Sequence, residues 1–94
     1  MNEIVGFEMH STKGFFYVKI DGNLEARMTF FFDDNDILNI RHTEVNPGHE
    51  GKGFGKKMVI KAVEFARERN LQIIPICPFV KSFFAKNPEF RDLL

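Results

Sequence analysis

The stretch VNPGHEGKGFGKK, residues 45–57, separates two parts of the chain that differ in pattern. Before it, runs of β-branched and aromatic residues alternate with polar turn residues, which predicts strands at 3–9, 15–20, 24–32 and 37–45. Short turns join these strands, so we expect an antiparallel meander. After the stretch, apolar residues recur at the spacing of a helix. The glycine-rich stretch therefore marks the change from sheet to helix.

The second part of the chain predicts a helix, a strand and a further helix. Apolar residues at helical spacing indicate a helix over 56–70, and an apolar run at 71–77 indicates a fifth strand. Pro78 is suited to open a second helix over 79–86. A right-handed crossover would place the fifth strand parallel to 37–45. The predicted fold class is α+β, with a mixed sheet, an antiparallel four-stranded meander, a parallel crossover and a C-terminal helix.

Length and composition limit the architecture. A chain of 94 residues allows one domain, 1–94, without room for a separate cofactor domain. Its 12 phenylalanines supply large apolar area for a small core. Three of them, Phe79, Phe83 and Phe84, are expected to pack the second helix onto the sheet.

Charge and cysteine content exclude several classes of protein. The 13 basic and 13 acidic residues give no net charge, which argues against a general nucleic-acid binder. The single cysteine forms no internal disulfide, and no Cys/His cluster has zinc spacing, so no metal is expected. No run reaches the roughly 20 apolar residues of a membrane span. We therefore expect a cytoplasmic protein without a membrane partner, and its oligomeric state stays open.

The glycines of the loop predict an anion site. Gly51, Gly53 and Gly55 allow a ligand to approach the backbone, and the first N–H groups of the following helix would point at it. Local positive charge comes from Lys52, Lys56 and Lys57. The alternative is a flexible turn with solvated lysines, but a loop between a strand and a helix favours phosphate binding.

Two common phosphate loops fit less well. A P-loop needs Lys and Ser or Thr where Phe54 and Gly55 occur. A dinucleotide fingerprint needs a glycine at Lys56 and a βαβ unit, whereas this loop follows a meander. An unrelated nucleotide or phosphate binder is therefore the weakest of the functional hypotheses.

The loop resembles a specific family motif. Val45-x-Pro47 followed by residues 50–56, EGKGFGK, resembles the acetyl-CoA pyrophosphate loop of the Gcn5-related N-acetyltransferases. From about residue 14 onward the chain resembles the small YjdJ-like branch of that family, through residues 41–45, 74–84 and 87–93. Glu50 occurs where the family usually has Arg or Gln, so we expect its side chain to point outward.

The resemblance implies a cosubstrate and its binding residues. Acetyl-CoA would place its pyrophosphate on the backbone amides of Gly51, Lys52, Gly53, Phe54, Gly55 and Lys56. Its pantetheine arm would run between the fourth and fifth strands, where backbone groups of Thr43, Glu44 and Val45 would bind it. The partner would be an amine acceptor, which the sequence does not identify.

Cys77 is the first candidate for the chemistry. It precedes Pro78 and is therefore a natural N-cap, and a helix N-terminus favours the thiolate form of a cysteine. A thiol here could act as a nucleophile or as the proton donor to the leaving thiolate. The alternative is a buried structural cysteine.

His42 is the second candidate. We expect it to share a strand face with Leu38 and Ile40, and Glu44 to lie on the same side and orient it, with Arg41 and Thr43 on the opposite face. Imidazoles titrate near neutral pH, which suits a general base for the acceptor amine. The alternative is a structural histidine. His10 and His49 are expected to be exposed loop residues.

The sequence therefore predicts an enzyme, an acetyl-CoA-dependent N-acetyltransferase in which His42 and Cys77 converge on the thioester. The alternative from a different class is a non-catalytic acyl-CoA-binding module, because the short chain leaves little for an acceptor site.

Overall fold

Four consecutive strands form an antiparallel meander, as predicted. The computed structural model describes residues 2–94, and its first strands are β1 Glu3–His10, β2 Lys13–Ile20, β3 Asn23–Phe32 and β4 Leu38–Val45. A fifth strand, β5 Ile73–Pro75, pairs parallel with β4, so the order in the sheet is β1-β2-β3-β4-β5. The predicted α+β class with its parallel crossover is confirmed.

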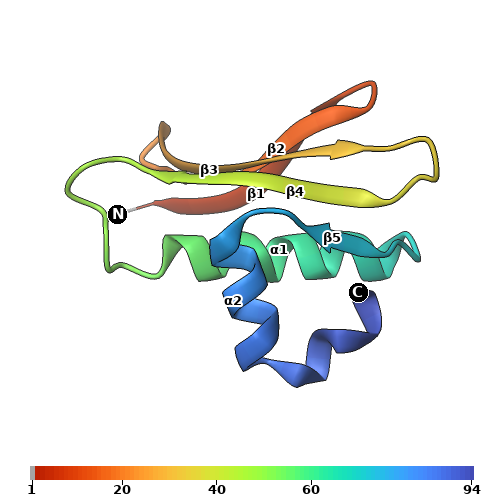
Figure 1. Cartoon of the computed structure of the whole chain (residues 1–94). Helices are drawn as coiled ribbons and strands as arrows, with labels where there is room; N and C mark the ends of the chain where they lie inside the picture. Colours follow the sequence, from red (N-terminus) through yellow and green to blue (C-terminus); the bar gives the residue numbers. More distant parts are fainter. Residues whose placement is uncertain (1) are drawn as a thin grey trace.

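The helices lie on one side of this sheet (Figure 1). They are α1 Phe54–Glu68, α2 Pro78–Lys86 and a terminal 3-10 helix, η1 Pro88–Leu93, which the sequence pattern did not predict. Helix α1 begins earlier than expected, and β5 is shorter than expected. Within residues 2–94, no helix combines the length and the hydropathy needed to cross a bilayer. The other face of the sheet carries no helix in the described chain.

Phenylalanines fill the core between α1 and the sheet. The Phe65 ring of α1 lies 4.9, 5.5 and 5.9 Å from the rings of Phe7, Phe16 and Phe30, measured between centroids. Such aromatic pairs each add about 0.5–1.5 kcal/mol beyond the burial of their area. The phenylalanine-rich composition therefore gives a short chain a rigid base for the loop that precedes α1.

A β-bulge interrupts β4 in its middle. Thr29 of β3 lies opposite His42, whereas its neighbour Phe30 lies opposite Ile40, so Arg41 is an extra residue on β4. A bulge of this kind adds one residue to one strand and shifts the alternation of side chains beyond it. Before the bulge the even-numbered residues of β4 face the helices, and after it the odd-numbered residues do.

Because of the bulge, the side chains after Arg41 in β4 face the sides of the sheet opposite to those predicted. Ile40 faces the helices, but after the bulge Thr43 and Val45 take that face, opposite the buried Met28 and Ala26. His42 therefore does not share a face with Ile40, and Thr43 is not on the opposite face as expected. The side chains of His42 and Glu44 lie on the helix-free face of the sheet.

Candidate functional site

Strands β4 and β5 separate just after Ile40. Ile40 is the last β4 residue paired with β5, opposite Pro75. The N–H groups of both Ile76 and Cys77 then donate to the Ile40 carbonyl, each at 3.0 Å. Beyond this point residues 41–45 have no partner strand on the β5 side. The sheet therefore has an open edge in the middle of the molecule.

Backbone groups of two β4 residues face this open edge. Asn46, just after the strand, donates its N–H to the Glu25 carbonyl on the β3 side at 2.8 Å. Alternate residues of a strand direct their N–H and C=O to opposite sides. Thr43 and Val45 accordingly direct theirs to the open edge, and Glu44 directs its groups to β3. Glu44 was also expected to bind at this edge, but because of the bulge its backbone groups point to β3.

A cleft of about 550 Å³ connects the open edge with the glycine loop and with α2. Most of the predicted binding residues line it, with the exceptions of Glu44 and Lys52. The lining residues are Thr43, Val45, His49, Glu50, Gly51, Gly53, Phe54, Gly55, Lys56 and Phe79.

The loop ends in a cradle of free amides. Gly51 and Gly53 have φ angles of 80° and 81°, in the region that glycine adopts without steric cost. The first bond of α1 runs from the Lys57 N–H to the Gly53 carbonyl at 3.1 Å. The N–H groups of Phe54, Gly55 and Lys56 are therefore free at the helix start, and the first turn carries no acidic residue. This arrangement suits a phosphate.

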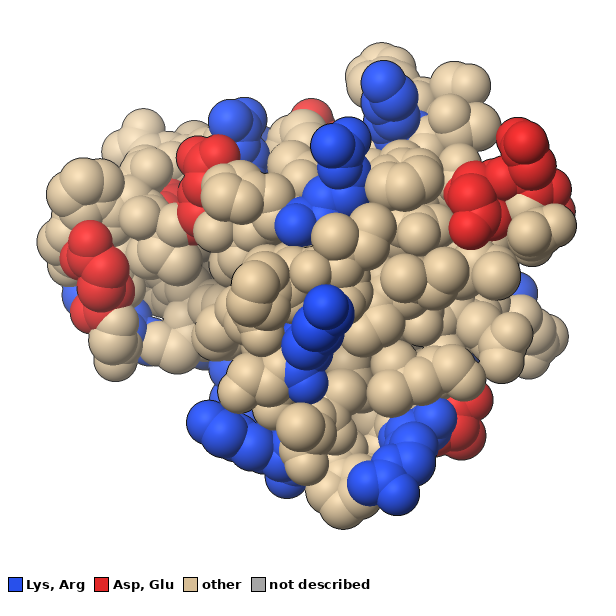
Figure 2. Space-filling view, in the orientation of Figure 1, with Lys and Arg blue, Asp and Glu red and all other residues tan. Residues whose placement is uncertain are grey.

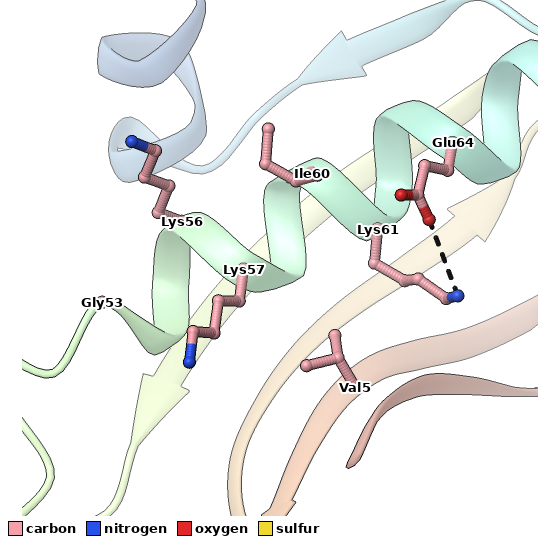
Figure 3. A pocket seen from close by; sticks show the side chains of 7 residues that line it. All are labelled: Val5, Gly53, Lys56, Lys57, Ile60, Lys61 and Glu64. Atoms are coloured by element: carbon pink, nitrogen blue, oxygen red, sulfur yellow. Dashed lines mark ion pairs between the residues drawn. The ribbon is translucent and has the colours of Figure 1, made fainter. Parts of the chain in front are cut away.

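Only one of the three predicted lysines is available at the cleft. Lys57 holds both carboxylate oxygens of Glu3, at 2.7 and 2.8 Å. Lys52 Nζ lies 3.3 Å from His49 Nδ1. Lys56 lines the cleft and makes no ion pair within residues 2–94. Figure 3 shows Lys56 and Lys57 leaving α1 in opposite directions, Lys56 toward α2.

A second hollow, of about 500 Å³, lies between β1 and α1 (Figure 3). Val5 and Ile60 supply apolar surface, and Lys61 pairs with Glu64 at 3.6 Å beside it. Gly53 lines both this hollow and the cleft, so the two meet at the start of α1.

Two side chains hold the loop in place. The Glu50 carboxylate accepts the Gly48 N–H at 2.9 Å, which ties this acidic group to its own turn. His49 stacks on Phe54 with centroids 5.5 Å apart, and its Nε2 lies 3.5 Å from Glu25 Oε2. His49 is therefore half-buried and anchors the loop to β3, whereas an exposed residue was expected.

Phe79 was missed as a cleft residue. It is 44% exposed, so it does not belong to the core as expected, whereas Phe83 and Phe84 are buried. A Cβ on Gly55 would come within 2.6 Å of the Phe79 ring tip. The missing side chain at Gly55 thus lets α2 approach α1 closely at the mouth of the cleft.

Cys77 is the N-cap of α2, as predicted from Pro78. Its side chain is buried, with 5% exposure. The Sγ atom lies 3.4 Å from Thr43 Oγ1 and makes no capping hydrogen bond to the helix. The thiol is therefore held against the residue that begins the open edge of β4.

His42 lies on the other face of the sheet. Its side chain is 64% exposed, and Nε2 lies 3.3 Å from Glu44 Oε1, which confirms that the two share a side. Arg27 approaches the same carboxylate at 3.9 Å. The structure brings Cys77 to Thr43 and His42 to Glu44, and no hydrogen bond joins the two candidates within residues 2–94. In the same range, no group of three His, Cys, Asp or Glu side chains is placed to hold a metal ion.

In this α+β fold, a separated sheet edge lies next to a helix start with free amides, an arrangement that suits an extended, phosphate-bearing ligand. Residues 15–93 match the family described as GCN5-related N-acetyl-transferase. The chain belongs to this family of N-acetyltransferases.

Solved structures and curated relatives agree with this assignment. A GCN5-like protein of Staphylococcus aureus, solved by NMR, is 36% identical with a TM-score of 0.68, over 93% of this chain and 84% of that one. A ribosomal-protein-alanine N-acetyltransferase of Brucella melitensis biovar Abortus 2308 shares the fold at 19% identity, with a TM-score of 0.65 over 83% of this chain and 62% of that one.

Curated relatives are longer than this chain. Protein NATD1 of Bos taurus is 27% identical over 74 residues, which are 78% of this chain and 66% of that protein. Streptothricin acetyltransferase of Streptomyces lavendulae is 39% identical over 59 residues, 62% of this chain and 31% of that enzyme. The chain thus spans just under two thirds of one relative and less than one third of the other.

Proposed function

We propose that residues 1–94 act as one minimal acetyltransferase domain of the YjdJ-like branch, which transfers acetyl from acetyl-CoA to an amine. The observation that carries this proposal is the cleft in which the open edge of β4 leads to the free amides at the start of α1. One end of this cleft offers backbone groups to an extended chain, and the other offers N–H donors to phosphates.

The residues of the cleft fit acetyl-CoA. The amides of the loop and of Phe54, Gly55 and Lys56 would hold the pyrophosphate, and Lys56 adds charge beside it. Thr43 and Val45 would pair their backbone groups with the pantetheine arm. The bound cosubstrate supplies a thioester whose acetyl end would lie where β4 and β5 separate.

Two proton-transfer groups flank that point from opposite faces of the sheet. His42, held by Glu44 on the helix-free face, would take the proton of the acceptor amine, directly or through a water. Cys77, held by Thr43 on the helix side, would donate a proton to the departing thiolate or act as the nucleophile. The predicted convergence of both side chains is thus replaced by approach from two sides.

One observation favours the second candidate, a non-catalytic acyl-CoA-binding module. Cys77 is almost fully buried and does not line the cleft, and within residues 2–94 no hydrogen bond joins it to His42. A module that binds acyl-CoA without turnover would need the cleft alone.

The test separates binding from chemistry. Acetyl-CoA and ATP are titrated in turn while the amide signals of Gly53 and Gly55 are followed by NMR. The protein is then incubated with acetyl-CoA and each of a panel of amines, and the amount of free CoA that is released is measured. Tight binding of acetyl-CoA over ATP together with CoA release supports the transferase, binding without release supports the module, and equal binding of ATP contradicts both.

A further inference from the structure

A separate hollow of about 430 Å³ lies at the point where β4 and β5 part. Its lining residues are Thr12, Lys13, Phe31, Phe32, Arg41 and Ile76. Arg41 is the bulge residue of β4, and Ile76 is bonded through its N–H to Ile40, the last paired residue. Thr43 of β4 and Cys77, the N-cap of α2, contact each other on the helix side of the same opening. The hollow and the cleft therefore lie on different sides of the point where β4 and β5 separate.

The side chains that line the hollow include two basic residues and no acidic residue. Lys13 and Arg41 line it together with no Asp or Glu, and neither makes an ion pair within residues 2–94. By contrast, Lys57 pairs with Glu3 at 2.7 Å. On the molecular face that carries β5 and α2, lysines and arginines are spread from the upper to the lower part, and acidic residues lie mainly toward the margins (Figure 2).

The Arg41 guanidinium is already oriented. It lies over the Phe31 ring, 5.5 Å from the centroid. Stacking on an aromatic face leaves the edge N–H groups of a guanidinium free for a bidentate contact, for which a carboxylate has the matching geometry. Phe31 and Ile76 supply the apolar surface beside it.

The geometry points to an acceptor that carries a carboxylate. In this inference, which rests on the proposed function, Arg41 and Lys13 bind the carboxylate of an amino acid or short peptide, and its apolar part lies against Phe31 and Ile76. His42 follows Arg41 in the chain and lies on the same helix-free face, so an amine held in this way is directed toward the candidate base.

The experiment compares acids with their neutral counterparts. L-phenylalanine, glycyl-L-phenylalanine and 6-aminohexanoate are each tested as acceptors against the corresponding carboxamide, with saturating acetyl-CoA. We expect kcat/KM to be about tenfold or more higher for the acids, as for charge-assisted hydrogen bonds in a partly exposed site. Arg41→Gln and Lys13→Gln should remove this preference, whereas Lys19→Gln, a change at the far end of the same face of β2, should retain it.

A binding measurement distinguishes failure of the carboxylate inference from failure of the proposed transferase function. Without acetyl-CoA, the three acids should shift the amide signals of Arg41 and Ile76, and Arg41→Gln should abolish these shifts. If the wild type transfers acetyl to carboxamides and acids equally, or the acids cause no shifts, the inference is overturned and the transferase stands. If acetyl-CoA binds but no amine is acetylated, the proposed function fails, and the acceptor role of this hollow fails with it.

Discussion

The Thr43 hydroxyl lies 3.4 Å from the Cys77 thiol, and this contact joins β4 to the start of α2 where β4 and β5 separate. Either atom can donate the hydrogen, so the pair can deliver a proton along the inner side of the opening. The contact exists only because the bulge at Arg41 turns Thr43 toward the helices. A single extra residue thus places a hydroxyl next to the thiol and moves His42 to the other face.

The first prediction concerns Cys77. Cys77→Ala should lower kcat at least tenfold while the Kd for acetyl-CoA, measured by calorimetry, stays within about twofold, because the thiol does not line the cleft. Thr43→Val should lower kcat less, and Thr43→Ser should restore it, since Thr43 acts through the thiol. A mass spectrum after incubation with acetyl-CoA shows whether Cys77 gains an acetyl group. Wild-type kcat in Cys77→Ala would remove the thiol from the mechanism.

The second prediction separates two neighbouring glycines. Gly53→Ala places a side chain at a φ of 81°, which should lower the free energy of unfolding by about 1 kcal/mol and weaken acetyl-CoA binding. Gly55 does not have a positive φ, so Gly55→Ala causes no backbone strain of this kind, but the new Cβ would displace the Phe79 ring. That variant should keep its stability, because alanine favours a helix by up to about 1 kcal/mol over glycine, yet bind acetyl-CoA less tightly.

Thermal unfolding and calorimetry of both variants check this prediction. The double variant Gly55→Ala with Phe79→Ala should bind better than Gly55→Ala alone if displacement of the ring is the cause. Equal loss of stability in the two single variants would contradict the distinction.

Most of the fold was predictable because each element has a local signal. Helix α1 follows from its apolar spacing, and the cap at Cys77 follows from Pro78. Asn70, just after helix α1, has a positive φ of 54°, a conformation that asparagine adopts more readily than most other residues. The cradle of free amides follows from glycines placed directly before a helix, and the comparisons support the family that the loop resembles.

The faces of β4 were not predicted, although the sequence contains the relevant signal. Ile40 and Val45 are five positions apart, an odd number, so simple alternation cannot place both toward the core. A bulge between them resolves the conflict, but its position depends on pairing with β3, a contact between distant segments. The charge partners of Lys57 and the exposure of Phe79 likewise depend on tertiary contacts with β1 and Gly55.

A third prediction compares adjacent lysines. Lys56→Gln should weaken acetyl-CoA binding several-fold, with a smaller effect at high salt, because Lys56 adds charge at the cleft. Lys57→Gln should leave affinity nearly unchanged and lower the free energy of unfolding by less than about 1 kcal/mol, as for other exposed ion pairs. Calorimetry at two salt concentrations checks both, and equal effects on affinity would argue against a specific role for Lys56.

A fourth prediction concerns acid stability. Asn39, Ile37 and Asn35 each donate a hydrogen bond to the Asp33 carboxylate, and the Asn39 side chain contributes most to holding the pKa of Asp33 below its ordinary value of 3.8. Since the folded form holds the carboxylate ionised, this contribution to stability is fully present above the unfolded pKa and is lost as pH falls through the lower folded pKa. Asp33→Asn should therefore lose stability at neutral pH and lose less than the wild type on acidification to about pH 3. Urea unfolding at the two pH values measures this, and parallel curves would refute it.

The last prediction tests His42 as the base on the helix-free face. His42→Gln should lower kcat by about 10²-fold or more with an alkyl amine, while the Kd for acetyl-CoA is unchanged because His42 does not line the cleft. Methoxyamine is a much weaker base than an alkyl amine and is unprotonated at neutral pH, so it needs less help from a general base, and its acetylation should fall much less in the same variant. Glu44→Gln should have an intermediate effect, because the 3.3 Å contact orients the imidazole, and Arg27→Gln serves as the control for charge on that face. If the alkyl amine and methoxyamine lose activity equally, His42 positions other groups of the site and does not accept the proton.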